Sequence, residues 1–306
     1  MFIYDLPNLF AILIVILVSF RIGLIPLWLS FFLCLFAFTP FFLNEVLFPA
    51  SYMPDQFQYY KVSKGVRSFA LDSFSDTSTV ESASWILALI PLPYIETIQS
   101  LGFFNRFIVT VLIIWLYSSK NLRGWPLLFI VFYPSLLLYS SLSLRDTLVL
   151  IFMILPVILF IENRRLLAVI FVLPLALFKY QNFFLVIVFF VVHLYFSRDS
   201  FVYRFRYMFL IIVIASLAPF MITIIEFLDI SRLNMFIDDG GRRNAYVHMR
   251  TIEDFIIIAM QSAPYFLMKP LPWEADSFLT FLQSFENILI LFFLSFMFIK
   301  TFELDK

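Results

Sequence analysis

Long apolar segments alternate along this chain with short polar ones, and within the apolar segments no regular alternation of inward and outward polarity occurs. Such runs are typical of membrane-spanning α-helices, whereas a transmembrane β-barrel would alternate residue by residue. We therefore predict an all-α, polytopic membrane bundle with about nine spans. They cover residues 6–20, 24–43, 105–118, 125–141, 147–161, 166–178, 182–197, 207–227 and 279–300.

Two shorter segments, 84–97 and 253–268, interrupt this pattern. Prolines and polar residues break both, so they fit interfacial or re-entrant helices on the outer face better than full crossings. If either crossed, the count would be ten or eleven. We see no internal repeat and no flexible linker, which predicts one membrane domain over residues 1–306 with outer loops at about 44–104 and 228–278.

Composition agrees with a membrane protein. Hydrophobic residues make up 62% of the chain and charged residues 14%, with a mean hydropathy of +0.97. The formal net charge is zero, which gives no general attraction to nucleic acid. The first residues lack the basic region and cleavage site of a secretory signal, so we expect the first helix to be retained. Cys34 is the one cysteine, which excludes an intramolecular disulfide.

Basic residues are concentrated in one set of short loops, if the two doubtful segments do not cross. Lysine and arginine favour the cytoplasmic side, so this set should face the cytosol, with the N-terminus outside and the C-terminus inside. The basic residues of this set are Arg21, Lys120, Arg123, Arg164, Arg165, Arg198, Arg204, Arg206, Lys300 and Lys306.

The apolar run from about 125 to 161 is too long for one crossing, because a helix of that length would measure about 55 Å against a hydrocarbon core of about 30 Å. The chain must turn at Ser140-Ser141-Leu142-Ser143-Leu144-Arg145-Asp146. The pair Arg145 and Asp146 either marks the water boundary or takes part in a functional site. On the predicted topology it faces outward.

Two further outer segments carry candidate groups. Asp55 and Tyr59 are spaced to share one face of a helix, where they could form part of a site. The alternative is an ordinary solvated amphipathic helix. Arg242 and Arg243 follow two glycines, and their guanidinium groups could fork onto phosphate oxygens; the alternative is an exposed turn. His248 lies a few residues beyond them.

The segment Lys269-Pro270-Leu271-Pro272-Trp273-Glu274 is stiffened by prolines where the chain returns to apolar sequence. Lys269, Trp273 and Glu274 are candidates there, against the alternative of a salt-bridged interfacial turn. Glu286, inside the last span, requires a partner or a water-lined cavity. Lys179 is a further candidate at a short outer turn. The alternative is that its long side chain only extends its charge to the membrane surface by snorkelling.

No nucleotide-binding loop, HExxH motif or cysteine and histidine set for zinc occurs in the sequence. The cytoplasmic loops are too short to form a catalytic domain. We therefore expect no metal and no cofactor.

Three short motifs together resemble a known family. Tyr133-Pro134-Ser135 through Ser140–Asp146 resembles the "PS...SS...(R/K)D" segment of the Wzy-like and EpsG-like glycan polymerases of bacterial polysaccharide gene clusters. Asp55 with Tyr59 is similar to the D-x-x-x-Y of their first large outer loop. Lys269–Glu274, followed by Glu286-Asn287, looks like their "RP-x-PWE...EN", with lysine in place of arginine.

This resemblance implies glycosyl transfer of the O-antigen polymerase type on the outer face of the inner membrane, between glycans carried on undecaprenyl pyrophosphate. Arg145, Arg242 and Arg243 would stabilise the pyrophosphate, and Asp55, His248 or Glu274 would act as base. Asp146 would either be catalytic or do no more than orient Arg145. The remaining substrate contacts would be Lys269, Lys179, Tyr59, Ser141, Trp273 and Glu286. Partners would be membrane lipid, the lipid-linked glycan and other polysaccharide-assembly membrane proteins.

Two other functions use the same charges. In a transporter or flippase for lipid-linked substrates they would bind the substrate within a moving cavity. In a non-catalytic membrane interaction protein the polar outer loops would bind another protein.

Overall fold

The computed structural model describes residues 2–44, 46–47, 49, 53–69, 78–197, 201–238, 246–275 and 277–304. Helices dominate these ranges, and no strand occurs within them. The predicted all-α fold is therefore confirmed. The chain divides into two compact units, Met1–Ser197 and Arg198–Lys306, which are described one at a time.

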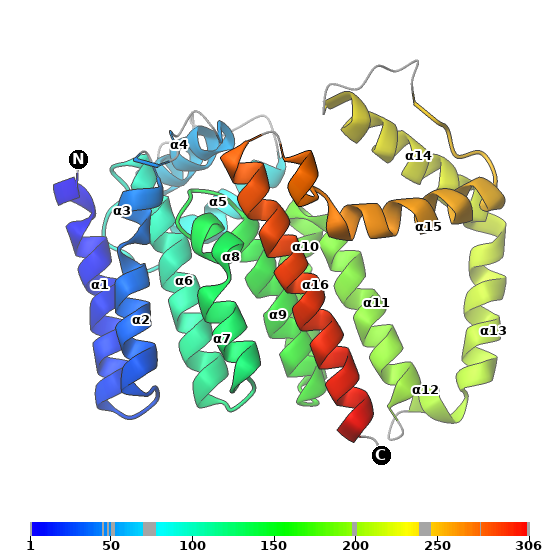
Figure 1. Cartoon of the computed structure of the whole chain (residues 1–306), viewed down its shortest axis with the longest axis horizontal. Helices are drawn as coiled ribbons and strands as arrows, with labels where there is room; N and C mark the ends of the chain where they lie inside the picture. The colour runs from blue at the N-terminus through cyan, green and yellow to red at the C-terminus, as the bar shows by residue number, and fades with distance from the viewer. Residues whose placement is uncertain are drawn as a thin grey trace. The chain divides into compact units, whose positions relative to one another are not determined.

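The first unit is a bundle in which most helices run side by side, while α4 lies across one end (Figure 1). Helix α4 packs on α5 and α6, and α3 contacts α6 and α8. The helices of this unit are α1 (Phe2–Arg21), α2 (Leu27–Ala37), α3 (Thr39–Leu43), α4 (Asp55–Arg67), α5 (Ser78–Ala88), α6 (Ile98–Ser118), α7 (Trp125–Phe132), α8 (Pro134–Tyr139), α9 (Asp146–Ile161), α10 (Arg165–Phe178) and α11 (Tyr180–Phe196).

The second unit is also helical. Helix α15 contacts both α14 and α16, and the 3-10 turn before α16 packs against that helix. Its elements are α12 (Phe201–Arg204), α13 (Arg206–Leu217), the 3-10 turn Ala218–Phe220, α14 (Met221–Asp238), α15 (Ile252–Met268), the 3-10 turn Pro272–Glu274 and α16 (Phe278–Leu304).

Within the described part of the chain, three helices have the length and apolarity needed to cross a membrane, at Ile3–Arg21, Ile98–Ser118 and Thr280–Ile299. Four further apolar helices are shorter, at Leu27–Leu43, Asp146–Ile161, Arg165–Phe178 and Tyr180–Phe196. The structure thus supports transmembrane helices, and the count of about nine spans stays a prediction.

Prolines account for two differences from the predicted spans. Segment 125–141 is divided into α7 and α8, because Pro134 lacks an N–H and holds Tyr133 in an extended conformation with ψ of 114°. Segment 207–227 is likewise divided, by the 3-10 turn that contains Pro219. Of the two doubtful segments, 84–97 is helical only to Ala88, whereas 253–268 lies in the continuous helix α15.

The core of the first unit is apolar, and so is much of its outer surface. Leu29, Phe103 and Phe178 are buried, while Ile3 and Leu166 on α1 and α10 are largely exposed. A water-soluble bundle would cover such faces with polar groups, so this surface is suited to contact with lipid.

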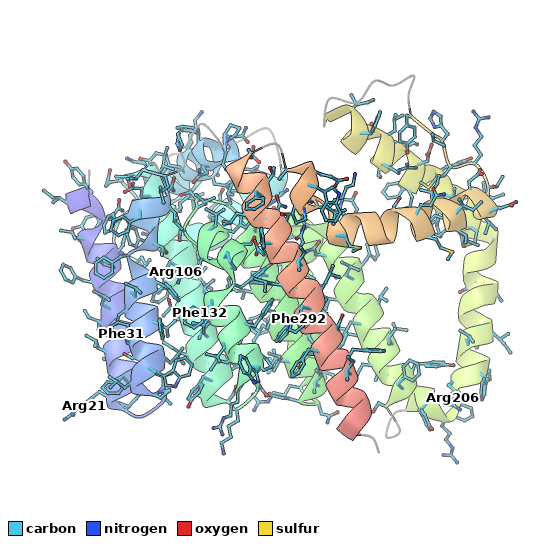
Figure 2. All side chains as sticks on the ribbon, in the orientation of Figure 1. Arg21, Phe31, Arg106, Phe132, Arg206 and Phe292 are labelled. Atoms are coloured by element: carbon cyan, nitrogen blue, oxygen red, sulfur yellow. The ribbon has the colours of Figure 1, made fainter. Side chains whose placement is uncertain are left out.

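One end of the first unit is rich in basic residues. The loops joining α1 to α2, α6 to α7 and α9 to α10 lie at one end, where Figure 2 labels Arg21. Helices α3 and α4, the turn between α8 and α9, and the turn at Lys179 lie toward the other end (Figure 1). The first set of loops carries Arg21, Lys120, Arg123, Glu162, Arg164 and Arg165.

Helix α6 approaches the turn between α8 and α9 so closely that only glycine fits at position 102. A Cβ at Gly102 would overlap the backbone carbonyl of Ser141, whose carbon would lie 3.1 Å away. The clash is with backbone, so a side-chain rotation cannot relieve it.

Gly102→Ala should therefore destabilise the protein by about 1–3 kcal/mol through overpacking. In an unhindered helix the same change would stabilise by about 0.5–1 kcal/mol, so the sign is diagnostic. Thermal unfolding of the detergent-solubilised protein measures it, with Val111→Ala on an exposed position of the same helix as control. Equal or greater stability of Gly102→Ala would contradict the close approach.

Candidate functional site

The turn Ser140–Leu144 lies inside the first unit, and Arg145, which follows it, is half-buried. Ser140, Ser141 and Ser143 are fully buried, and Leu142 and Leu144 are nearly so. Of the predicted pair, Arg145 is half-buried and Asp146, which begins α9, is exposed, so the two alternatives for this pair, a water boundary or a functional site, both stay predictions. A buried turn must find partners for its backbone polar groups.

Helix α6 supplies several of these partners. The Asn105 side-chain amide donates to the carbonyls of Leu142 and Leu144, each at 2.7 Å. The hydroxyl of Ser143 donates in turn to the carbonyl of Ile98 at the start of α6. The turn is thereby fixed along its length to one helix.

Arg106, the next residue on α6, is 1% exposed and lies within the bundle (Figure 2). Its Nη1 donates to the hydroxyl of Ser140 at 2.7 Å, and its guanidinium carbon lies 5.5 Å from the centre of the Phe36 ring. Its Nε has no hydrogen-bond partner among the described residues. Sequence reasoning missed Arg106, although an Asn-Arg pair opening an apolar segment was a visible signal.

Ser141, predicted as a substrate contact, is used by the fold. Its hydroxyl donates to the carbonyl of Leu137 at 2.7 Å and lies 2.7 Å from the hydroxyl of Thr39 at the start of α3. The turn is therefore held to α3 as well as to α6.

Helix α4 docks on the same turn through Gln56. Its side-chain oxygen accepts a hydrogen bond from the backbone N–H of Ser143 at 2.9 Å and another from the Asn44 amide at 3.1 Å. Asn44 is fixed in turn, because Gln99 donates to its carbonyl at 2.9 Å. Gln56 thus joins segments 87 residues apart in the sequence.

This docking brings Asp55 and Tyr59 to Arg145 and Asp146. Tyr59 is 2% exposed, and burial raises the pKa of its phenol to about 12. The charge of Arg145 acts against this shift, while the charges of Asp55 and Asp146 add to it. The pKa of Tyr59 therefore responds to all three charges, and α4 is solvated on one face only.

Arg145 retains hydrogen-bonding capacity. Its Nη1 is buried without a partner in the described part of the chain, and within those residues no ion pair joins it to Asp55 or Asp146. A buried guanidinium N–H that lacks a protein acceptor is suited to bind an anionic group. We call Asp55, Tyr59, Arg145 and Asp146 the Arg145 cluster.

In the second unit, Lys269 and Glu274 form an ion pair with Nζ and Oε1 3.2 Å apart. The N–H of Leu271 donates to Glu274 Oε2 at 3.2 Å, and this bond, followed by Lys269, lowers the pKa of Glu274. The salt-bridged turn, one of the two predicted alternatives, is therefore present. Trp273 between them is 79% exposed.

The other predicted residues have separate positions. Asn287 on α16 donates to the carbonyl of Lys269 at 2.8 Å, and its neighbour Glu286 is buried. Lys179 lies between α10 and α11 with partial exposure. His248 lies 2.7 Å from Asp229 in the second unit. Arg242 and Arg243 lie outside the described residues.

The described residues contain no group of histidine, cysteine and acidic side chains that could hold a metal ion. Comparison of the chain with protein-family models, curated proteins and solved structures gave no match. The site therefore rests on the geometry above.

Asn105→Ala should destabilise the first unit by about 2–4 kcal/mol, because two buried carbonyls lose their donor and each orphaned group costs about 1–3 kcal/mol. Asn121→Ala is the control, since Asn121 is an exposed asparagine at the other end of the unit. Thermal unfolding of the two purified variants measures the difference. Equal midpoints would mean that the amide does not hold the turn.

Tyr59 should make stability depend on alkaline pH. Its pKa is about 12 when folded and about 10 when unfolded, so its contribution is complete below pH 10 and is lost as pH rises toward 12. Between pH 10 and pH 12 the free energy of unfolding of the wild type should therefore fall by roughly 3 kcal/mol more than that of Tyr59→Phe. Chemical denaturation at pH 9 and pH 12 measures this, and parallel losses in both proteins would exclude a buried phenol.

Proposed function

We propose that the protein is a metal-independent, membrane-embedded glycan polymerase. It joins glycan units carried on undecaprenyl pyrophosphate at the outer face of the bacterial inner membrane. The observation that carries the proposal is the Arg145 cluster, in which the D-x-x-x-Y segment and the Ser-Leu-Arg-Asp turn, two of the motifs that resemble this family, meet through Gln56 and Ser143.

The chemistry of such a transfer requires a cation for the leaving group. When the sugar leaves its carrier, negative charge develops on the pyrophosphate, and fixed N–H donors in a site of low dielectric stabilise it. The buried, unpartnered Nη1 of Arg145 is such a donor. One donor of this kind lowers a barrier by about 3–4 kcal/mol.

The acceptor requires a base. As the acceptor hydroxyl oxygen bonds to the anomeric carbon, its proton passes to a carboxylate or imidazole, and the pyrophosphate departs with the electron pair of the broken C–O bond. Asp55 is exposed near Tyr59 and Arg145, and can take that proton in the first unit. Glu274 is less suited, because Lys269 already neutralises it.

The membrane setting follows from the charges. With the Arg21, Lys120 and Arg164 loops in the cytosol, the opposite end of the first unit, which carries α3 and α4, faces outward. About nine spans then require the shorter apolar helices to cross as well; 14 to 17 residues measure roughly 21–26 Å, which a bilayer accommodates by local thinning.

Arg145→Ala should abolish long glycan chains while leaving the protein in the membrane. The measurement is the length distribution of surface polysaccharide on gels, in cells whose only copy of the gene carries the change. Arg145→Lys, which keeps the charge without the planar fork, should retain only short chains. Arg123→Ala, an exposed arginine at the other end of the first unit, is the matched control and should leave the chains unchanged.

Normal chain length in Arg145→Ala would overturn the proposal. The position of the accumulating lipid-linked unit separates a polymerase from a transporter. Units on the outer leaflet of the Arg145→Ala membrane support polymerisation, whereas units held on the inner leaflet would identify a flippase instead.

A further inference from the structure

The second unit contains a pocket whose lining carries charges of both signs. Its volume is about 440 Å³, which is in the range of small-molecule sites. The lining comes from the second unit alone. It consists of Glu226, Asp229 and Ile230 on α14, and of His248, Met249 and Arg250 in the segment that leads into α15.

Asp229 is already used by the fold. Its carboxylate accepts from the N–H of Met249 at 2.8 Å, from the hydroxyl of Tyr246 at 2.9 Å and from Nδ1 of His248 at 2.7 Å. Burial acts to raise the pKa of this carboxyl, but the three bonds outweigh burial and lower it below the ordinary value. Asp229 is therefore ionised, and it holds the segment before α15 against α14.

The ionised carboxylate fixes the tautomer of His248. A carboxylate can only accept, so Nδ1 of His248 must carry the hydrogen. In the neutral ring Nε2 then bears a lone pair. Nε2 has no hydrogen-bond partner within the described residues, and the side chain is 44% exposed. The neutral His248 therefore offers the pocket an acceptor and not a donor.

Glu226 and Arg250 bring opposite charges to the same pocket. Both are exposed, and within the described residues neither forms an ion pair. The backbone of Arg250 is fixed at the start of α15, because its N–H donates to the carboxylate of Asp254 at 3.1 Å. One carboxylate and one guanidinium of the lining are thus available to a ligand.

These groups suit a ligand that carries an ammonium and a phosphate. An ammonium has donors and no acceptor, so it matches the carboxylate of Glu226 and Nε2 of His248. A phosphate matches the guanidinium of Arg250, which can donate to two oxygens in parallel. A ligand with negative charge alone would be repelled by Glu226 and Asp229. The lining therefore favours a ligand in which the two charges balance.

Apolar side chains around the pocket indicate that this ligand is a lipid. Phe227 and Ile230 on α14 and Val247 beside the pocket are 55%, 59% and 66% exposed. Acyl chains would remove such surface from water, whereas a soluble headgroup would leave it uncovered. The unit is also suited to a membrane, because α15 contacts α16, which contains the candidate crossing Thr280–Ile299.

We propose that this pocket binds the headgroup of an ethanolamine phospholipid. The ammonium donates to Glu226 and to Nε2 of His248, and the phosphate accepts from Arg250, while the acyl chains lie along the exposed apolar side chains of α14. Asp229 acts through His248 as a positioning residue. No member of the Arg145 cluster takes part, so the inference goes beyond the proposed function and is tested apart from it.

The test compares phosphatidylethanolamine with phosphatidylcholine of the same acyl chains, by native mass spectrometry of the detergent-solubilised full-length protein. The nitrogen of choline is quaternary and has no N–H to donate. Ethanolamine lipid should therefore bind about tenfold more tightly. Phosphatidylglycerol, which has the phosphate without the ammonium, should also bind more weakly. Equal affinity for the ethanolamine and choline lipids, or tighter binding of phosphatidylglycerol, would overturn the proposal.

Two variants locate the preference in the pocket. Glu226→Gln keeps the size of the side chain and removes its charge. His248→Asn keeps a donor toward Asp229 and removes the acceptor at Nε2. Each should bring the two affinities to within about threefold of each other. Glu253→Gln, an exposed glutamate of the same unit outside the lining, is the matched control and should keep the tenfold preference. A full preference in both pocket variants would overturn the site.

Two further arms test the phosphate contact and the lipid as the source of the headgroup. Arg250→Ala should weaken the binding of both lipids by about tenfold, because both carry the phosphate. Glycerophosphoethanolamine, which is the same headgroup without acyl chains, should bind at least about tenfold more weakly than the lipid. Unchanged binding in Arg250→Ala, or equal affinity for the soluble headgroup, would overturn the proposal.

Discussion

The first unit depends on one constraint: a turn of the backbone lies inside a helical bundle, where no water can satisfy its polar groups. Each N–H and C=O of such a turn needs a partner, because an orphaned buried group costs about 1–3 kcal/mol. Asn105, Gln56 and Ser143 meet this need for the turn Ser140–Leu144. The same bonds fix α6, α4 and α3 around the turn, so the position of Arg145 follows from how the turn is satisfied.

Other buried polar groups support α6 in this role. The carboxylate of Asp5 on α1 accepts from the hydroxyls of Thr97 and Ser100, at 2.5 and 2.6 Å, where α6 begins. A carboxylate at that point also meets the positive end of the helix dipole. Burying the Arg106 side chain costs more free energy than burying Asp5. A buried cation with one hydrogen bond, to Ser140, recovers little of its desolvation energy from the contacts described. What Arg106 does contribute is its bond to Ser140, which helps to hold the turn in one conformation.

The all-α fold was predictable from the sequence, because long apolar runs without alternation favour α-helices, while the number of membrane crossings stays a prediction. The breaks at Pro134 and Pro219 were only partly within reach of sequence reasoning, because proline removes a backbone donor wherever it occurs, yet Pro156 and Pro174 lie inside continuous helices. The pairing of Gln56 with Ser143 was not, because it depends on the register of packed helices across 87 residues. The Arg145 cluster lay between these cases: its members were named in advance, while the amide that brings them together was not.

The two units differ in the chemistry they present. The first holds a guanidinium that lacks an acceptor, whereas the second holds an imidazole whose lone pair is set by a carboxylate. In the first unit, a guanidinium N–H that lacks an acceptor suits an anionic group. In the second unit, an imidazole that donates from Nδ1 presents the lone pair of Nε2. Each group is tuned by local contacts within its own unit, Arg145 through the buried turn and His248 through Asp229. What each unit offers chemically therefore follows from how its own fold treats its polar residues, because a buried donor without an acceptor attracts an anion, and a ring held at Nδ1 can accept only at Nε2.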